Sequence, residues 1–191
     1  MGSTTATAGS RIHNAIILAA QAHQGQFRKG TQIDYLVHPM EVLEILSSMD
    51  ADTDLLIAGI LHDTVEDTAL TLSTIQKNFG DDVASLVGRH TENKDLTWEE
   101  RKKHSVDVLS SAEQRYQMLI LADALSNLRS MSADYQAVGD QLWQRFHAPK
   151  EKQCWYYGAM RDAMAPLGRQ ANCQSKYEEL SQIYEELFCG E

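Results

Sequence analysis

The sequence predicts an all-α protein, and three observations support this fold class. Apolar residues recur at helical spacing in almost every segment, as at Ile12 and Ile16 near the N-terminus. No segment shows the alternation of apolar and polar residues that a half-buried strand requires. The three prolines, Pro39, Pro149 and Pro166, each lie where a helix can start or stop. We therefore expect about eight to ten short helices.

Each helix is delimited by its apolar periodicity together with residues that favour a helix end. Asp52 precedes the third helix, and Gly80 separates the fourth from the fifth. Thr97 and Glu100 have the spacing of a capping box at the start of the sixth. The polar segment 28–38 is expected to be a loop. The expected helices span residues 11–26, 39–48, 53–62, 72–79, 81–89, 97–110, 112–131, 139–146, 150–167 and 174–188.

Length, charge and cysteine content bound the class of protein. A chain of 191 residues can bury a core as one domain, which we expect over residues 11–191, behind a flexible tail at residues 1–10. The net charge of -10 argues against a nucleic-acid-binding protein but permits a small phosphorylated ligand. The three cysteines show no CxxC spacing, and no apolar run is long enough to span a membrane. We therefore expect a cytoplasmic protein with reduced thiols, whose oligomeric state these features do not predict.

The segment GILHDTVEDT at residues 59–68 places polar groups directly after an apolar run. On a helix, residues four apart share a face, so Glu66 would lie over His62 and Asp67 over Asp63. A partly unwound turn would still keep these side chains within a small volume. Ionised carboxylates beside a buried helix are destabilising unless something neutralises them, and a divalent cation does so efficiently. The segment therefore indicates a metal site.

Two residues elsewhere in the chain are suited to complete such a site. His38 precedes a helix-starting proline, and Asp123 lies within the apolar run MLILADALSNL. With His62 and Asp63 they would supply two imidazoles and two carboxylates, a set that suits manganese, iron or zinc better than calcium. A water bound to such an ion becomes acidic enough to yield hydroxide for attack on phosphorus. The two acids that follow in the same segment would orient that water or move its proton.

The same residues also permit a less specific interpretation. A histidine on an apolar face is usually a hydrogen-bonded core residue, and a His–Asp pair is common by chance. Several polar groups on core-directed faces are harder to satisfy by packing alone. The spacing therefore favours a metal site but leaves the structural alternative open.

Other polar residues are not assigned to a site. Four histidines have no partner spacing, so surface or capping roles are expected for them: His13, His90, His104 and His147. The run ERKKH at residues 100–104 is interpreted as a solvated face, with steering of an anionic nucleotide as the alternative.

Four ordered motifs connect the candidate residues to a known family. They are AHQGQFRKGTQIDYLVHP at 22–39, GILHDTVEDT at 59–68, FGDDVASLV at 79–87 and LADALSNLRSM at 121–131. Together they resemble the HD-superfamily hydrolase domain of the RelA/SpoT family. The likeness is closer to the free-standing small alarmone hydrolases of the metazoan SpoT homologue type, which lack a synthetase. It covers about residues 11–167 and implies an all-α HD-superfamily domain.

The resemblance also implies a reaction, a cofactor and a set of site residues. The implied reaction removes the 3′-pyrophosphate from guanosine tetra- or pentaphosphate, (p)ppGpp, with one Mn²⁺ ion per chain or another divalent transition metal. The implied metal ligands are His38, His62, Asp63 and Asp123, and the implied catalytic acids are Glu66 and Asp67. The implied substrate contacts are Arg28 and Lys29 beside the base and phosphates, Asn127 and Ser130 near the ribose and base, and Lys152 and Tyr156 at the distal phosphates.

Three positions depart from the family pattern. Ala124 stands where a basic residue usually follows the metal-binding aspartate, and Ser126 stands where an aromatic residue or histidine is usual. Asp34 replaces the proline that usually precedes the loop tyrosine. Loss of a charge is expected to loosen the positioning of Asp123, and an extra acid near Arg28 to change the preferred base or phosphate pattern. Because no implied ligand is missing, we expect an active enzyme.

Two alternative functions remain open from the sequence. Hydrolysis of an adenosine alarmone such as (p)ppApp, or of another phosphorylated nucleotide, would use the same chemistry on a different ligand. A catalytically silent HD module that binds a nucleotide or a partner protein would be expected to lack a ligand or one of the two acids, and this chain lacks neither. Parallel assays on guanine and adenine nucleotides distinguish the first alternative, and metal-dependent turnover distinguishes the second.

Overall fold

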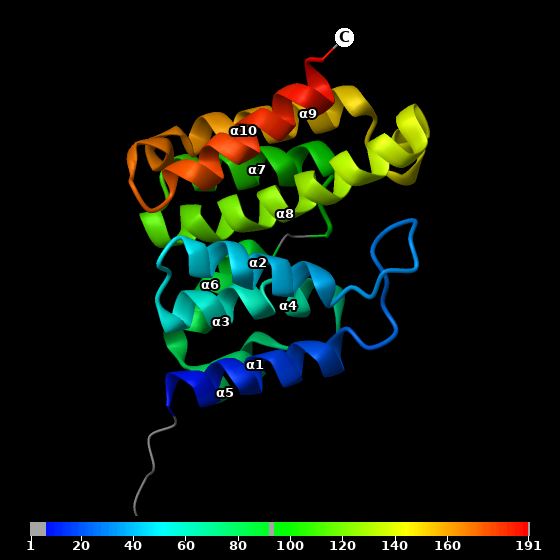
Figure 1. Ribbon diagram of the computed structural model, residues 1–191. Coiled ribbons are helices and arrows are strands. Elements are labelled where there is room, and N and C mark those ends of the chain that lie inside the picture. The colour runs from blue at the N-terminus through cyan, green and yellow to red at the C-terminus, as the bar shows by residue number, and fades with distance from the viewer. Residues whose placement is uncertain (1–6, 92–93, 191) are drawn as a thin grey trace, which may run out of the picture.

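The computed structural model describes residues 7–91 and 94–190, which form helices joined by short connections (Figure 1). The predicted all-α fold class is confirmed. Within the described ranges, the only β-type pairing is an isolated bridge between Phe27 and Asp34. The helices are α1 (Ala8–Ala22), α2 (Val37–Ser48), α3 (Thr53–Leu61), α4 (Thr64–Asp67), α5 (Leu72–Phe79), α6 (Asp81–His90), α7 (Trp98–Ser110), α8 (Gln114–Val138), the 3₁₀ helix η1 (Gly139–Arg145), α9 (Lys150–Ala163), the 3₁₀ helix η2 (Ala165–Arg169) and α10 (Gln174–Phe188).

Helix α3 forms the centre of the N-terminal half of the fold. Helices α1, α2, α6 and α8 all pack against it, and its residues from Ile57 to Leu61 are buried. In Figure 1, α8 runs between the layer of α2 and α3 and the layer of α7, α9 and α10. Because α8 contacts both layers, residues in its middle lie at the centre of the molecule.

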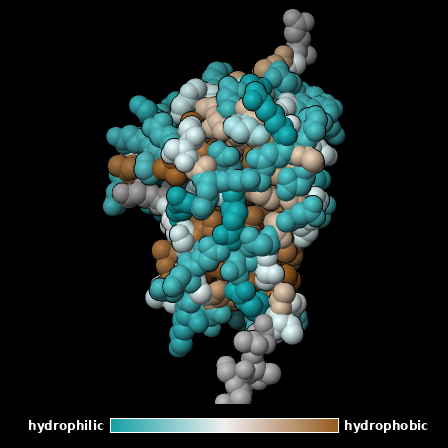
Figure 2. All heavy atoms as spheres, turned by 90° about the vertical axis from the view of Figure 1, so that its left-hand side faces the viewer, coloured by the Kyte–Doolittle hydropathy of each residue, from teal (hydrophilic) through white to brown (hydrophobic). Residues whose placement is uncertain are grey.

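The outer surface of the molecule is largely polar. Figure 2 shows one side of it, where hydrophilic residues dominate and hydrophobic residues are visible only in small areas between them. None of the described helices combines the length and apolarity that crossing a membrane requires.

Capping residues account for several helix starts. Thr97 and Glu100 form the predicted capping box, in which the Glu100 carboxylate accepts a hydrogen bond of 2.9 Å from the Thr97 amide. The Asp52 carboxylate accepts hydrogen bonds from two backbone amides of α3, both at 3.0 Å. Gly80 has a φ of 97° and separates α5 from α6 as predicted.

The first helix begins earlier than predicted. The Thr7 side chain accepts a hydrogen bond from the backbone amide of Ser10, and this cap starts α1 at Ala8 rather than at residue 11. Residues 8–10 are therefore helical, and residues 1–6 of the predicted tail lie outside the described residues. The assignment of residues 11–191 to a single domain stays a prediction.

Two later helix ends also differ from the prediction. Helix α8 continues beyond residue 131 to Val138, where Gly139, with a φ of 57°, ends it. The helix predicted over 150–167 ends at Ala163, and η2 follows. Pro166 disfavours the α conformation in the residue before it, which explains this interruption.

Helices α2 and α3 approach each other closely at Gly59. A Cβ atom at Gly59 would lie 2.4 Å from Leu46 Cδ1 and 3.2 Å from Val42 Cγ1, both on α2. We expect Gly59→Val to lower the free energy of unfolding by about 1–3 kcal/mol, because Leu46 and Val42 are fully buried and have little room to move. Urea denaturation measures this change. Gly88→Val is the matched control, because its nearest neighbour, Leu72, is exposed; equal losses in both variants would contradict the prediction.

Candidate functional site

Three segments of the fold bring the four predicted metal ligands together. His38 lies in the first turn of α2, His62 and Asp63 lie between α3 and α4, and Asp123 lies within α8. His62 Nε2 is 3.1 Å from His38 Nε2 and 2.9 Å from Asp63 Oδ2. His38 Nε2 is 3.4 Å from Asp63 Oδ2 and 3.2 Å from Asp123 Oδ1. Two imidazole nitrogens and two carboxylate oxygens therefore surround one point.

The chain unwinds for one turn at His62 and Asp63. The helix predicted over residues 53–62 ends at Leu61, whose carbonyl accepts a hydrogen bond of 2.7 Å from the Thr64 hydroxyl. In a regular helix, two successive side chains point about 100° apart. The unwound turn instead directs both His62 and Asp63 at the same point, while Asp67 N still bonds to Asp63 O at 2.9 Å.

Hydrogen bonds to the outer ring nitrogens fix the orientation of both histidines. The Ser126 hydroxyl donates to Glu41 Oε2 at 2.9 Å, so its oxygen accepts the 2.8 Å hydrogen bond from His38 Nδ1. His62 Nδ1 donates to the backbone carbonyl of Gly59 at 2.8 Å. Because each Nδ1 carries the proton, each Nε2 presents a lone pair to the cluster. This is the arrangement that metal-binding histidines use.

The cluster requires a positive charge at its centre. Lone pairs of His38 and His62 face each other beside two carboxylates, and these four groups repel one another unless a cation lies between them. Burial disfavours an imidazolium, but the carboxylates of Asp63 and Asp123 outweigh this effect and raise the pKa of His62 well above its usual range. A divalent metal would supply this positive charge, and the donor set fits such a metal.

Two further side chains hold the carboxylates in place. The Tyr35 hydroxyl donates to Asp63 Oδ2 at 2.6 Å, and Asn127 Nδ2 donates to Asp123 Oδ1 at 2.7 Å. Burial and the Asp63 carboxylate raise the pKa of Tyr35 above its ordinary value, so the phenol remains a donor. Sequence reasoning assigned no role to Tyr35; the available signal was its position in the loop motif, three residues before His38.

A cavity of about 190 Å³ is lined by three of the four predicted ligands, His38, Asp63 and Asp123. The predicted acidic pair, Glu66 and Asp67, lines it from α4. Glu66 is partly buried and Asp67 is exposed. Lys94 Nζ donates to the Glu66 carbonyl at 2.6 Å and lies 3.5 Å from the Asp67 carboxylate, so it links α4 to the connection between α6 and α7. The two acids therefore face the same space as the metal cluster.

A second cavity, of about 260 Å³, adjoins the first at Tyr35 and Asn127, which line both. Besides Asn127, three of the predicted substrate contacts line this second cavity: Arg28, Lys29 and Ser130. Arg28 Nη2 donates to Asn127 Oδ1 at 2.9 Å, and Asn127 in turn donates to Asp123. A continuous hydrogen-bonded path thus connects Arg28 to Asp123 of the cluster.

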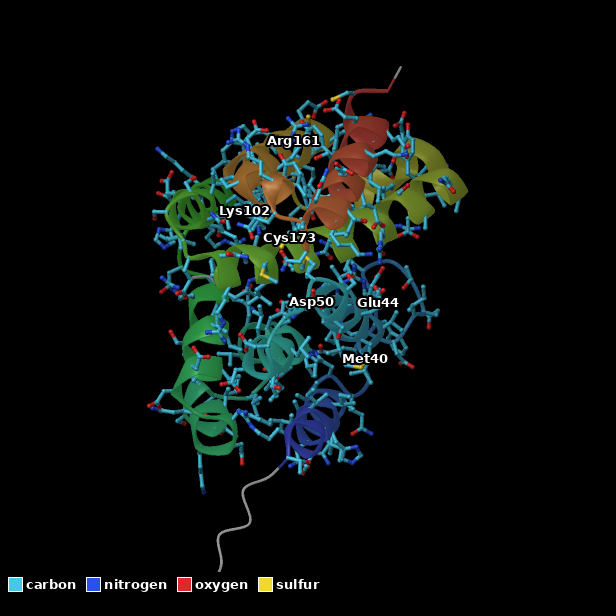
Figure 3. All side chains as sticks on the ribbon, turned by 60° about the vertical axis from the view of Figure 1, so that its left-hand side comes forward. Met40, Glu44, Asp50, Lys102, Arg161 and Cys173 are labelled. Atoms are coloured by element: carbon cyan, nitrogen blue, oxygen red, sulfur yellow. The ribbon has the colours of Figure 1, made fainter. Side chains whose placement is uncertain are left out.

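Lys152 and Tyr156, the predicted substrate contacts on α9, do not line the same cavity. Tyr156 lines the first cavity. Among the residues that the structure describes, Lys152 lines neither cavity and instead forms an ion pair with Glu99 of α7. Lys102 of α7, labelled in Figure 3, lines the first cavity instead, with its Nζ 4.6 Å from the centre of the Tyr156 ring. The interpretation of residues 100–104 as a plain solvated face is therefore wrong for Lys102.

His90 is a second residue whose predicted position is wrong. It was expected at the surface, but its side chain is 14% exposed and its Nε2 lies 3.5 Å from Asp63 Oδ1. A signal for this position was present in the sequence. Val83, Leu86 and Val87 form the buried face of α6, and His90 continues the same helical spacing one turn further.

The three departures from the family pattern have different surroundings. Ala124 is 1% exposed within the core, and Asp123 beside it is held by Asn127. Ser126 forms the hydrogen bonds that orient His38, so it has acquired a positioning role. Asp34 is exposed and belongs to the isolated bridge. The predicted effects on Asp123 and on base preference stay predictions.

Replacement of Ser126 by alanine is expected to weaken metal binding by about 10- to 100-fold. Without its hydroxyl, His38 Nδ1 loses its acceptor and the ring can turn away from the cluster. Titration calorimetry with Mn²⁺ measures the change. Ser181→Ala on α10 is the control, because its hydroxyl donates to the Tyr177 carbonyl, far along the chain from the cluster. Equal affinity of the Ser126→Ala variant and the wild type would refute the positioning role.

Comparison with known families matches an HD-domain model to residues 15–150. The chain belongs to the HD-domain family. The matched range includes the HD pair itself, His62 and Asp63, and the two partner residues His38 and Asp123. In this HD-domain protein the four predicted metal ligands therefore lie inside the matched region, whereas Tyr156 lies beyond its end.

Relatives of known activity narrow the family further. The HD-domain chain is 33% identical over 189 residues to the mouse (Mus musculus) guanosine-3′,5′-bis(diphosphate) 3′-pyrophosphohydrolase MESH1, a match that covers 97% of each chain. It is 39% identical over 123 residues to the Xenopus tropicalis MESH1, covering 63% of this chain and 69% of the relative. A solved structure of a metazoan orthologue of SpoT, described as hydrolysing ppGpp, superposes with a TM-score of 0.76 at 26% identity, covering 96% of this chain and 98% of the other. These matches confirm the predicted small alarmone hydrolase family.

Proposed function

We propose that this protein removes the 3′-pyrophosphate from (p)ppGpp in a reaction that depends on a divalent metal, with manganese as the ion. The observation that carries the proposal is the convergence of His38, His62, Asp63 and Asp123 beside a cavity that two further acids line. The same pyrophosphohydrolase activity is named for MESH1 relatives that align with nearly the whole chain. The adenine analogue remains the alternative substrate.

The four ligands suit a metal ion that accepts both nitrogen and oxygen donors. Two neutral imidazoles and two carboxylates favour manganese or iron over calcium, which prefers oxygen ligands alone. When bound, a divalent ion at this position polarises phosphoryl oxygens and lowers the pKa of a water molecule. Tyr35 and Asn127 keep the two carboxylates oriented while the substrate enters.

The positions of Glu66 and Asp67 support a role in accepting the proton of the attacking water. Glu66 and Asp67 line the cavity without belonging to the four-atom cluster, and a carboxylate in this position can act as a general base. Glu66 is the more buried of the two, and its carboxylate is better shielded from bulk solvent. We assign it the role of general base, with Asp67 orienting the water.

The two adjoining cavities suit the two ends of the nucleotide. Arg28 and Lys29 in the second cavity supply positive charge, and a guanidinium can stack on a purine while it binds a phosphate. Asn127 and Ser130 follow Asp123 along one face of α8, so a ribose beside them places its 3′ substituent toward the cluster. Lys102 at the first cavity is placed to bind the departing pyrophosphate.

Two broader assignments belong to the same proposal. We assign residues 11–191 to one catalytic domain, since α8 packs against both α2 and α3 on one side and α10 on the other and so joins the two layers. We also place the protein in the cytoplasm, where its three free cysteines, Cys154, Cys173 and Cys189, would remain reduced.

The test is release of pyrophosphate from ppGpp by the purified chain, first stripped with a chelator and then supplied with Mn²⁺. We expect turnover only after the ion is restored. We expect none in Asp63→Ala, because this variant lacks the carboxylate that lies beside both His38 and His62. Asp107→Ala on the exposed face of α7 is the matched control and should retain activity. ppApp assayed in parallel measures the base preference.

Absence of release by a folded, manganese-loaded protein would overturn the ppGpp assignment. Release that persists in Asp63→Ala at the wild-type rate would instead overturn the role of the cluster. Faster turnover of ppApp would keep the reaction and change the substrate.

A further inference from the structure

His90 approaches the metal cluster from a side that the other two histidines do not occupy. It is the last residue of α6, and its ring centre lies 5.0 Å from that of His62. Its Nε2 is 3.5 Å from Asp63 Oδ1 and 3.9 Å from Asp123 Oδ2. The cluster therefore has a third imidazole that the four-ligand set does not use.

The three histidines divide the carboxylate oxygens between them. His38 and His62 approach Oδ2 of Asp63 and Oδ1 of Asp123. His90 approaches the opposite oxygen of each carboxylate, Oδ1 of Asp63 and Oδ2 of Asp123. Both aspartates thus present one oxygen to the pair of histidines and the other to His90, which is how carboxylates are placed when they bridge two cations.

The distances from His90 Nε2 to the two carboxylate oxygens fit ligands of one common ion better than they fit direct hydrogen bonds. A distance of 3.5–3.9 Å from Nε2 to the two carboxylate oxygens exceeds the range of an N–H···O hydrogen bond. Two donors that each lie about 2.1 Å from one ion are roughly 3 to 4 Å apart, depending on the angle between them. We propose that His90 Nε2, Asp63 Oδ1 and Asp123 Oδ2 hold a second divalent cation, bridged by the two carboxylates to the ion at His38 and His62.

The charges in the first cavity support a second ion. Among the described residues, those that line this cavity include one lysine, Lys102, and four acids, Asp63, Glu66, Asp67 and Asp123. One divalent ion leaves this lining net negative, or neutral when Lys94 beside Asp67 is counted, although the proposed substrate is a polyphosphate anion. A second divalent ion makes the lining net positive, so that the substrate is attracted rather than repelled.

The second position also has a chemical use. In enzymes that cleave phosphate esters with two ions about 3.5–4 Å apart, one ion stabilises the attacking oxygen and the other the leaving oxygen. This role rests on the proposed hydrolase function, whereas binding of the second ion rests only on the three donor atoms. The two claims are therefore tested separately, and the binding test needs no substrate.

The experiment counts the ions that the chain binds. Apo-protein is titrated with Mn²⁺, and the bound metal is measured by elemental analysis and by electron paramagnetic resonance. We expect two ions per chain in the wild type, with the closely spaced hyperfine pattern of a magnetically coupled pair. His90→Gln, which keeps a polar side chain of similar size, should bind one ion and show the pattern of isolated Mn²⁺.

Matched controls separate a lost ligand from a damaged fold. His13→Gln makes the same substitution at an exposed position of α1 and should bind two ions. Thermal unfolding of metal-free protein should be alike in the wild type and both variants. A wild type that binds a single ion overturns the second position while leaving the proposed hydrolase function intact. Two ions in folded His90→Gln would equally overturn the assignment of His90 as a ligand.

Discussion

Replacement of Glu66 by glutamine is expected to lower kcat by about 10²- to 10⁴-fold. Glutamine preserves the size of the side chain at the cavity wall but cannot accept a proton from the attacking water. Because the four predicted ligands lie on other residues, Mn²⁺ affinity should change little. Steady-state kinetics on ppGpp at saturating Mn²⁺ measures kcat, and titration calorimetry measures the affinity.

Glu178→Gln on α10 provides the control for this experiment. Its carboxylate accepts a hydrogen bond from Gln174 within the same exposed helix face, so its loss should leave kcat unchanged. A Glu66→Gln variant with wild-type kcat would remove Glu66 from the proton transfer. A variant that fails to bind Mn²⁺ would show that Glu66 is a ligand rather than a base.

Removal of the metal is expected to lower the thermal stability of the protein. A ligand present at a hundredfold excess over its Kd stabilises the folded state by about 2.7 kcal/mol, which for a chain of this size raises Tm by roughly 5 to 11 °C. The ion also replaces mutual repulsion within the cluster by attraction, since His38, His62, Asp63 and Asp123 converge within bonding distance of one point. Differential scanning calorimetry with Mn²⁺ or with chelator measures the difference.

The Asp123→Asn variant tests whether this stabilisation comes from the cluster. It retains the shape of the side chain and loses one negative charge, so its Tm should be nearly the same with and without Mn²⁺. The wild type with calcium in place of Mn²⁺ should show a smaller rise, because calcium disfavours imidazole ligands. An equal rise in wild type and Asp123→Asn would indicate that Mn²⁺ binds elsewhere on this acidic protein.

The sequence was most informative where a motif fixes local chemistry. The periodicity of apolar residues predicted the all-α class because helices bury one face whatever their final neighbours are. The cluster was predictable for a different reason. His62 and Asp63 follow the most apolar helix of the chain, and buried charges in that position require a partner. The placement of His38 and Asp123 beside them depended on the ordered motifs, since no spacing rule connects α2 with α8.

Tertiary packing explains why sequence reasoning missed Lys102 and Tyr35 and misplaced Lys152. Lys102 lies on a polar helix, and only the contact of α7 with α9 places it at the cavity beside Tyr156. Lys152, on α9, pairs across the same contact with Glu99 instead. Tyr35 reaches Asp63 because the loop after α1 folds back through the hydrogen bond from Tyr35 N to Gln26 O. Helix ends differed for a related reason, since a single cap such as Thr7 outweighs weak periodicity.

Helix α8 carries residues of both cavities on one rigid rod. Asp123 borders the cluster, Asn127 lines both cavities and Ser130 lines the second, so about 10 Å of helix separates the two outer residues. A regular helix does not change its length when a ligand binds. Under the proposed function, the distance between the phosphorus that is attacked and the base that is recognised is therefore set before the substrate arrives. Nucleotides whose phosphate lies nearer to or farther from the base cannot satisfy both ends, so α8 acts as a molecular ruler that selects the position of the scissile bond.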